Sequence, residues 1–339
     1  MSWLDAFPFV CPRCRAPVTR VRDEAFACTP CAASYPVVLG IPDFRLSPDP
    51  WIGVDDDRAK GVRLERETAG ASLEAMVRAY WRMTPDTSAE RAERFIEHVM
   101  SAEVRSREWI APIAGTNATS SRWLDLGCGT ADLTAAVASL ASKAPIDVVG
   151  LDVAFRWLVV ARRRLALAGL ESKLVCANAE ALPFEVDAFD RVIALGVLEH
   201  VDDPRRALGE ARRVLRPNGT IRLRIANRYS LLPEPHVGLF GVGWLPRPVA
   251  EWWVRLRTGQ SYRHHHPLGC GALRRALRAA RFTTVTVEAA QLLSADRARL
   301  SRSPLRALLP AYEWVRRTPV LSMVLRLVAP LLDASATRA

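Results

Sequence analysis

Residues 123–132 read WLDLGCGTAD, and this stretch decides the fold class. Its first four residues are typical of a buried strand, two glycines follow, and Ala131–Ala141 has the apolar spacing of a helix. A strand, a glycine-rich turn and a helix form the crevice in which open α/β sheets bind nucleotide-like ligands. Gly127 and Gly129 allow a sharp turn and a close approach to a ligand, which a Cβ atom would prevent. A single Gly-x-Gly also fits an ordinary strand-to-helix turn, so the choice between that turn and a ligand-binding one depends on the elements that follow.

A second strand is predicted at Ile146–Asp152, and it ends on a carboxylate. Asp152 lies 23 positions after Gly129, close to the roughly 20-residue spacing of an acid that hydrogen-bonds ribose hydroxyls. Further strands are predicted at 172–177, 189–195 and 221–226, with a helix at Arg205–Leu215 and a turn at 216–220. This order of elements predicts a parallel sheet with right-handed crossovers.

Five segments carry a family resemblance: LDLGCGTAD, GLDVA, ANAEALPF, FDRVIALGVLEHVDDP and RVLRPNGTIRL. In order and spacing they resemble the class I S-adenosylmethionine-dependent methyltransferases, most closely the small-molecule branch that includes the ubiquinone-type enzymes. The resemblance covers about residues 121–290 and implies an α/β fold with a Rossmann-like, doubly wound, mostly parallel seven-stranded sheet. A dinucleotide-binding fold is disfavoured because the first turn lacks a third glycine.

The resemblance also implies S-adenosylmethionine as the cofactor and a set of residues that hold it. These are Asp125, Gly127, Cys128, Gly129, Asp152, Val153, Asn178, Ala179 and Leu195. Asp152 would bind the ribose, Asn178 and Ala179 would meet the adenine edge, and the side chain of Leu195 would lie beneath the sulfonium. Ala131 replaces a common glycine, and Asn178 replaces the usual aspartate, whose charge is lost although an amide oxygen can still accept a hydrogen bond. We therefore expect weaker cofactor binding rather than an inactive fold.

The N-terminal residues 1–45 are predicted to be a zinc ribbon. Two Cys-x-x-Cys pairs, separated by 13 residues, supply four thiolates at the spacing of a structural zinc site; they are Cys11, Cys14, Cys28 and Cys31. Two disulfides, or cysteines with no shared role, are the alternative. The run 34–44 resembles the small zinc-ribbon activator proteins that bind and stabilise several methyltransferases, which implies a docking or stabilising role here.

Residues 46–120 are predicted to be a linker followed by a helical cap. The linker, 46–60, carries prolines and an acidic run, and helical apolar spacing extends from Leu64 to Ile113. Helices before the first strand commonly cap the cofactor pocket in the family that this chain resembles. Tyr80 and Trp81 are therefore candidates for lining that pocket, although packing in a core is the favoured interpretation.

Residues 227–269 are predicted to be a lid over the acceptor. They follow a strand carboxyl end, where open-sheet enzymes bind ligands, and loops of this length are usually lids or binding elements. Four aromatic residues suggest an apolar or aromatic acceptor: Phe240, Trp244, Trp252 and Trp253. A small helical subdomain with its own core is the alternative.

Two histidines are the candidates for catalysis. Methyl transfer from an activated sulfonium requires alignment of the acceptor and removal of its proton, and histidine is the side chain that titrates near neutral pH. His200 follows the fourth strand, and His236 lies in the insertion between prolines and glycines. A non-catalytic polar role stays open for each. His264–His266 are expected to face solvent or substrate, because three consecutive histidines cannot all face one metal ion.

Residues 291–339 are predicted to be an amphipathic tail divided by prolines. Leu321–Val328 is too short and too charged to span a bilayer. The tail suits peripheral contact with the inner face of a membrane, where its arginines would meet anionic lipid, or a contact with protein, which is favoured.

The net charge of +11 raises the question of nucleic-acid binding. Lysine occurs only at positions 60, 143 and 173, so the charge is almost all arginine, a bias that a GC-rich genome produces. Arg162–Arg164 and Arg212–Arg213 are expected on solvated helix faces. The sequence opens without a basic, apolar leader, and its seven cysteines do not form a secreted disulfide pattern, so the cytoplasm is the expected location.

Together these features predict a zinc-ribbon-tethered methyltransferase that acts on a small or lipid-like acceptor, at oxygen. An rRNA or tRNA base methyltransferase is the alternative, although an Asn/Asp-Pro-Pro-Tyr motif does not follow the fourth strand. A non-catalytic scaffold that binds the cofactor is the third hypothesis, supported only by Ala131 and Asn178. The acceptor, the atom methylated and the oligomeric state are left open.

Overall fold

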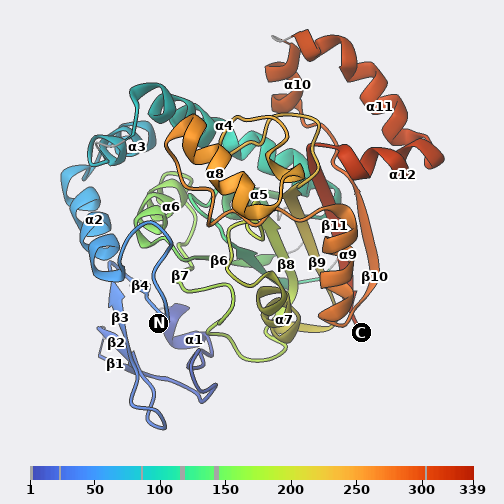
Figure 1. Cartoon of the computed structure of the whole chain (residues 1–339). Coiled ribbons are helices and arrows are strands. Elements are labelled where there is room, and N and C mark those ends of the chain that lie inside the picture. Colours follow the sequence, from blue (N-terminus) through green and yellow to red (C-terminus); the bar gives the residue numbers. More distant parts are fainter. Residues whose placement is uncertain (1–2, 23, 85–86, 115–118, 141–144, 302–303) are drawn as a thin grey trace. The chain divides into compact units, whose positions relative to one another are not determined.

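The computed structural model describes residues 3–22, 24–84, 87–114, 119–140, 145–301 and 304–339. The chain divides into two compact units, Met1–Phe189 and Asp190–Ala339, each of which is described by itself (Figure 1). Among the described residues, no helix combines the length and the apolar character that crossing a bilayer requires.

The first unit contains three parallel strands in the order β5-β6-β7. They are β5 (Ser121–Leu126), β6 (Ile146–Asp152) and β7 (Leu174–Cys176). The glycine-rich turn leads from β5 into α5 (Asp132–Leu140), and α6 (Phe155–Leu167) connects β6 to β7. These strands and helices confirm the order predicted from the sequence. β7 is shorter than predicted, α5 begins at Asp132 rather than Ala131, and Ala141 lies outside the described residues.

The N-terminal residues form a small antiparallel sheet of order β1-β2-β3-β4 after a one-turn helix. Its elements are α1 (Trp3–Ala6), β1 (Thr19–Val21), β2 (Ala25–Ala27), β3 (Ser34–Val38) and β4 (Ile41–Pro42). This ribbon joins the larger sheet at β7, because the amide of Phe44 donates to the carbonyl of Cys176 at 2.7 Å. The ring of Phe9 lies 5.2 Å from that of Phe44 and 6.0 Å from that of Phe184. The ribbon therefore shares a core with the β5-β6-β7 part of the first unit.

Three helices connect the ribbon to β5: α2 (Val54–Glu67), α3 (Leu73–Arg82) and α4 (Ala89–Ala114). The linker predicted over 46–60 is therefore wrong from Val54 onward, because the acidic run Asp55–Asp57 forms the first turn of α2, where carboxylates favour the helix dipole. A Cβ at Gly61 would lie 2.7 Å from the ring of Phe155, so α2 packs directly on α6.

Tyr80 and Trp81 belong to the core between these helices. Tyr80 is buried, Trp81 packs against the same cluster, and the Tyr80 ring centroid lies 4.1 Å from that of Trp157. Core packing, the favoured interpretation, is confirmed.

The arginines of α6 do not form a solvated face, so that expectation is wrong. Arg164 is only 5% exposed and donates to the carbonyls of Thr130 and Val99. Arg162 and Arg163 donate to the carbonyls of Leu39 and Ala71 and pair with Glu65. Long side chains that bind backbone carbonyls fasten α6 to its neighbours.

The second unit contains four strands in the order β10-β11-β9-β8. Its elements are β8 (Phe189–Leu195), α7 (Pro204–Val214), β9 (Leu215–Ala226), η1 (Val242–Trp244), α8 (Arg247–Thr258), α9 (Cys270–Ala279), β10 (Phe282–Ala289), α10 (Ser294–Ser301), η2 (Pro304–Leu308), α11 (Leu309–Arg317), α12 (Pro319–Val328) and β11 (Leu331–Arg338). The turn predicted at 216–220 is assigned to β9, although Asn218, at φ 64°, retains the left-handed backbone of a turn.

β11 corrects the predicted tail. The last residues of the chain run antiparallel to both β9 and β10, from Leu331 opposite Ala226 to Arg338 opposite Phe282. The α/β domain, predicted to span residues 121–290, therefore also includes the C-terminal strand β11. With three strands from the first unit and four from the second, the chain has the predicted Rossmann-like α/β architecture with a mostly parallel seven-stranded sheet.

Candidate functional site

The glycine-rich turn after β5 has the backbone geometry that its sequence predicts. Gly127 and Gly129 have φ of +73° and +50°, a region that favours glycine. The amides of Gly127 and Cys128 both donate to the carbonyl of Leu151, at 2.7 and 2.9 Å, which ties the turn to β6. Ala131 is buried and also left-handed, at φ 59°, where a Cβ costs roughly 1–2 kcal/mol. The replacement of a glycine at this position therefore leaves strain beside the turn.

Asp152 connects the turn to the loop after β6. Its two carboxylate oxygens accept hydrogen bonds from the amides of Gly129 and Ala154, both at 2.8 Å. Burial raises the pKa of Asp152, although these two amides favour the charged form. Each carboxylate oxygen has a second lone pair, so the side chain can still accept from the two hydroxyls of a ribose.

Asp125 lies deeper in the same site. It is 1% exposed, and its carboxyl accepts a hydrogen bond of 2.6 Å from the hydroxyl of Thr134. Burial, with Asp132 and Asp152 nearby, raises the pKa of Asp125 to about 8. A carboxyl group of this kind is neutral in the free protein at neutral pH, and a cationic ligand would favour its ionised form.

Asn178 is engaged by the segment that follows the ribbon. Its amide oxygen accepts from the backbone amides of Leu46 and Ser47, at 2.8 and 3.2 Å, and its amide nitrogen donates to Ser47. These bonds occupy the side-chain oxygen of Asn178, which is the atom that would have to accept a hydrogen bond from the adenine. In this conformation Asn178 holds the segment 46–47 beside the predicted adenine edge. The carbonyl of Val153 accepts a hydrogen bond from the side chain of Arg45, which precedes this segment.

A buried ion-pair network lies next to the loop between β6 and α6, and we call it the Asp–Arg clamp. Its members are Asp43, Arg45, Asp49, Asp57 and Arg156. Asp57 is the centre: it pairs with Arg45 at 2.7 Å and with Arg156 at 2.9 Å. It also accepts the amide of Phe155 at 2.7 Å, at the start of a helix whose N-cap residue has only a methyl side chain. The clamp thereby connects the ribbon segment, α2 and α6.

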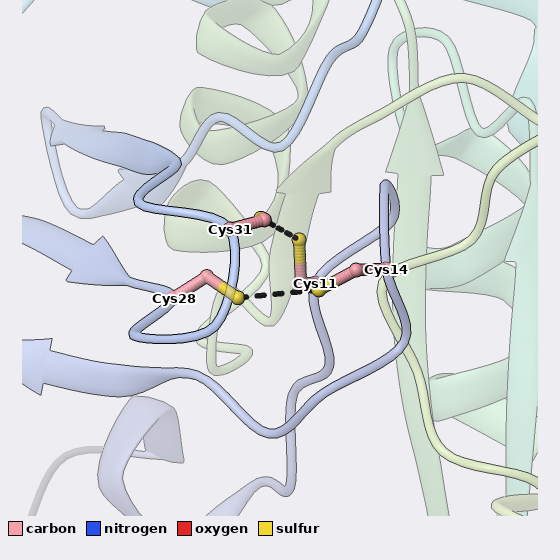
Figure 2. Close-up of side chains that lie close together, drawn as sticks. All are labelled: Cys11, Cys14, Cys28 and Cys31. Atoms are coloured by element: carbon pink, nitrogen blue, oxygen red, sulfur yellow. Dashed lines mark hydrogen bonds between the residues drawn. The ribbon is translucent and has the colours of Figure 1, made fainter.

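The four cysteines predicted to bind zinc lie together, as Figure 2 shows. The Sγ atoms of Cys11 and Cys31 are 3.5 Å apart, those of Cys14 and Cys28 are 3.4 Å apart, and all four sulfur atoms lie within 4.8 Å of one another. All four are free thiols, so the disulfide alternative is not what the structure shows. Zn–S bonds of about 2.3 Å in a tetrahedron place the sulfur atoms about 3.8 Å apart, so this cluster fits a zinc ion.

The two predicted catalytic histidines also lie together, with a third that was not predicted to join them. The rings of His200 and His236 are 4.7 Å apart, and the ring of His265 lies 5.2 and 4.7 Å from them. Burial lowers the pKa of His200 and of His265 to about 3. His265 is partly buried in this cluster rather than fully solvated, and a position facing the substrate stays a prediction.

Glu234 orients His236. Its Oε1 lies 2.6 Å from Nδ1 of His236, and its Oε2 accepts the amides of His236 and Val237 at 2.8 and 2.9 Å. Burial alone would lower the pKa of His236, but the Glu234 carboxylate raises it. Nε2 of His236 is consequently the ring nitrogen that faces away from the carboxylate.

The predicted lid has a small core of its own, as in the alternative interpretation. Val242, Ala250, Val254 and Tyr262 form this cluster, and Trp253 packs against it. The other three aromatics of the segment are largely exposed, at 69% for Phe240, 52% for Trp244 and 62% for Trp252. The segment is thus a small subdomain with its own core, and its role as a lid over the acceptor stays a prediction.

Residues 124–223 match the family described as "Methyltransferase domain". A demethylmenaquinone methyltransferase from Thermus thermophilus is 41% identical over 122 residues, which cover 36% of this chain and 51% of that protein. A ubiquinone biosynthesis O-methyltransferase from Roseobacter denitrificans is 35% identical over 136 residues, 39% of this chain and 52% of that protein. A solved S-adenosylmethionine-dependent methyltransferase from Mesorhizobium loti has 21% identity and a TM-score of 0.47, with 68% of this chain and 98% of that chain covered. The chain spans about half the length of the curated relatives it matches.

The chain therefore carries a methyltransferase domain. The matched region includes Asp125, Asp152, Asn178 and His200, whereas the ribbon, the lid segment and the C-terminal elements lie outside it. Leu195, at the end of β8, belongs to the second unit, and its place beneath a sulfonium stays a prediction.

Proposed function

We propose that this protein is an S-adenosylmethionine-dependent methyltransferase that acts on a small, quinone-type or lipid-like acceptor, at oxygen. The observation that supports it most is the turn after β5, where Asp152 accepts the amide of Gly129 and keeps lone pairs for a ribose. The names of two relatives, a demethylmenaquinone methyltransferase and a ubiquinone biosynthesis O-methyltransferase, support the acceptor class.

The cofactor brings an activated methyl group, so the residues of this chain mainly bind and align. Asp152 and Val153 would hold the ribose end, and the turn of Gly127, Cys128 and Gly129 would surround the methionine end. Asp125 would ionise beside the cationic ligand. Ala179, which is buried, would contact the adenine, while Asn178 would position the segment 46–47 next to it. Leu195 would complete the pocket below the sulfonium.

His200 and His236 are the proposed catalytic residues, because the structure places them in one cluster with the oriented Glu234. Replacing either with alanine should reduce turnover roughly 10²- to 10⁴-fold, the usual loss when a group that handles a proton is removed. Affinity for S-adenosylmethionine should not change, which calorimetry can check. His264→Ala is the matched control from the same triplet, and normal turnover of both cluster variants would contradict the assignment.

The ribbon cysteines are proposed to hold one structural zinc ion, because four thiolates close the coordination sphere. Tyr35 supports the site, since its hydroxyl lies 3.0 Å from Sγ of Cys11. Metal analysis of the pure protein should find zinc, and Cys28→Ser should lose it together with stability. Cys270→Ser, at a buried cysteine of α9, is the control, and full zinc content in Cys28→Ser would contradict the site.

The acceptor class is tested with the full chain, isotope-labelled S-adenosylmethionine and two quinone precursors. We expect label on the oxygen of a prenylated catechol and none on the ring carbon of a demethylated naphthoquinone. Carbon methylation alone would overturn the choice of oxygen. Bound cofactor without transfer to either precursor would favour the scaffold hypothesis, and transfer to RNA would favour the nucleic-acid alternative.

The C-terminal helices are proposed to contact either protein or the inner membrane face that holds a lipid-like acceptor. The exposed apolar residues of α12 support a contact of this kind: they are Val320, Met323, Val324 and Leu327. Arg316 and Arg317 end the preceding helix, which suits anionic lipid.

A further inference from the structure

We propose that His200, His236 and His265 bind a single divalent transition-metal ion and leave one coordination position open for an oxygen ligand. The three residues come from separate parts of the second unit: the turn after β8, the start of the lid segment and the loop just before α9. A cluster assembled from three distant parts of the chain is a property of the fold rather than of local sequence.

The geometry of the cluster is close to that of a metal site. One ring nitrogen from each histidine lies within 4.8 Å of the other two. Zn–N bonds of about 2.0–2.1 Å in a tetrahedral site place ligand nitrogens about 3.3 Å apart, so small side-chain rotations would suffice. Two ring pairs are already perpendicular or nearly so, at 88° for His200 and His236 and 71° for His200 and His265, as expected for rings that converge on one point.

The groups around the cluster orient its members. Glu234 accepts from the Nδ1 side of His236, the arrangement in which a carboxylate directs the other ring nitrogen of a histidine to a metal. Tyr262 stacks on His265 with an angle of 2° between the planes. The amide of His266 donates to the carbonyl of Glu199 at 2.6 Å, which ties the segment of His265 to that of His200. Each histidine is therefore held by at least one neighbour.

Two buried polar atoms next to the cluster support a bound species. Oε2 of Glu199 and the hydroxyl of Tyr262 have no hydrogen-bond partner among the described residues, although both residues are buried. Glu199 directly precedes His200, and Tyr262 covers His265. Buried polar atoms normally have partners, and a metal-bound water or hydroxyl would supply one.

The ligand set indicates the class of ion. Three imidazoles suit zinc, iron, copper, cobalt or nickel, whereas magnesium and calcium prefer oxygen ligands. Three protein ligands are the number found in catalytic zinc sites, which keep a position open, and the four ribbon cysteines would instead form a closed, structural site. Glu199 and Glu234, both buried, would balance the charge of the ion.

The role of the ion rests on the proposed function. An acceptor hydroxyl bound at the open position would lose its proton to water more readily, because the metal stabilises the oxygen anion. The oxygen lone pair would then form the new C–O bond with the methyl carbon while the C–S bond of the sulfonium breaks, and the electron pair stays on sulfur in the neutral thioether product. In this arrangement His200 and His236 act as metal ligands rather than as free bases.

Metal binding can be tested without any substrate. The full chain, stripped of metal and titrated with Co²⁺, should bind two equivalents with distinct spectra. A thiolate-to-cobalt charge-transfer band would report the ribbon, and weaker visible bands without thiolate character would report the histidines. His200→Ala, His236→Ala and His265→Ala should each lose the second equivalent and keep the first, so the ribbon serves as an internal check of folding. His264→Ala should keep both.

A wild-type chain that binds only one equivalent, with thiolate character, would overturn the proposal. So would histidine variants that keep both equivalents. Because cobalt binding is read without S-adenosylmethionine or acceptor, an enzyme that methylates neither quinone precursor yet binds the second ion would contradict the proposed function alone. Zinc in place of cobalt, followed by metal analysis, should give the same stoichiometry.

Discussion

At the scale of single residues, Asp152 has two roles that a substitution would remove together. It is the residue proposed to bind the ribose, and it accepts hydrogen bonds from the amides of Gly129 and Ala154. Asp152→Ala should weaken S-adenosylmethionine binding by roughly 1.5–3 kcal/mol, tenfold or more in Kd, because a hydrogen bond to a charged group is lost. Isothermal titration calorimetry measures the change.

Asp147 offers a matched control at the other end of the same strand. It pairs with Lys173 and Arg122 at the start of β6, so Asp147→Ala removes a carboxylate without altering the turn. Affinity that is unchanged in Asp152→Ala, or reduced equally in both variants, would show that the pocket has been assigned to the wrong residues.

Asp125 should make the stability of the free protein depend on pH. Its pKa is about 8 in the folded protein, above the usual value of 3.8, so the folded state retains a proton that the unfolded chain has lost. The stabilisation that this proton provides is complete below about pH 4 and disappears as the pH rises to about 8. Relative to Asp125→Asn, which does not titrate, the wild type should lose up to about 1.4 kcal/mol of unfolding free energy per pH unit.

Urea denaturation at several pH values between 4 and 9 checks this prediction. Asp55→Asn is the control, because that side chain is 95% exposed and should leave the pH profile unchanged. Parallel profiles for the wild type and Asp125→Asn would mean that Asp125 is ionised in the folded protein.

The sequence predicted such single residues well where spacing follows from backbone geometry. The glycine turn and the carboxylate that ends the next strand could both be located, because a parallel strand pair brings them together whatever the rest of the chain does. The partners of Asn178 could not be predicted, since Leu46 and Ser47 lie more than a hundred residues away in the chain. The burial of Arg164 was missed for the same reason.

At the scale of elements, the Asp–Arg clamp determines how the ribbon segment is attached to α2 and α6. Asp57→Ala would leave Arg45 and Arg156 buried without their shared partner, in side chains that are 0% and 7% exposed. Removing one partner of a buried pair costs about 3–5 kcal/mol, so this variant should unfold at markedly lower urea concentration. Chemical denaturation followed by tryptophan fluorescence measures the loss.

Asp55→Ala, two positions earlier in the same helix, tests whether the effect belongs to the clamp. Its carboxylate is exposed and pairs only with Arg58 among the described contacts, so the loss of stability should not exceed about 1 kcal/mol. Equal losses in the two variants would mean that helix α2, rather than the clamp, is what the substitutions weaken.

Elements with strong apolar periodicity were predicted with nearly correct bounds, and the exceptions have physical reasons. The acidic start of α2 was interpreted as a linker because it has no apolar periodicity, and the partners of the buried Asp57 come from other segments of the chain. β11, with the sequence LLDASATR, has little strand propensity. Its place is determined by pairing with β9 and β10 and by the ion pair of Arg224 with Asp333, which only the folded chain reveals.

At the scale of the whole molecule, the net charge of +11 is the property that still separates the two enzyme hypotheses. Part of the arginine charge is used inside the fold: Arg45, Arg156, Arg164 and Arg224 are buried and bonded to carboxylates or carbonyls. Guanidinium groups that are buried and bonded in this way cannot contact the phosphates of a nucleic acid. An enzyme that binds RNA would need exposed basic side chains for its phosphate contacts, and each such contact would add to the salt dependence of binding.

We therefore expect RNA to be retained weakly and without preference for sequence or structure. Affinity measured by fluorescence anisotropy with a structured and an unstructured RNA should be similar for both, and should vanish between low and physiological salt, as counterion release predicts for a few exposed arginines. Arg162→Ala, which removes a charge bonded to Leu39 and Glu65, should have no effect, whereas Arg317→Ala, at an exposed residue at the end of α11, should weaken the residual binding. A tight complex with the structured RNA alone, stable at physiological salt, would replace the small-acceptor hypothesis with the nucleic-acid one.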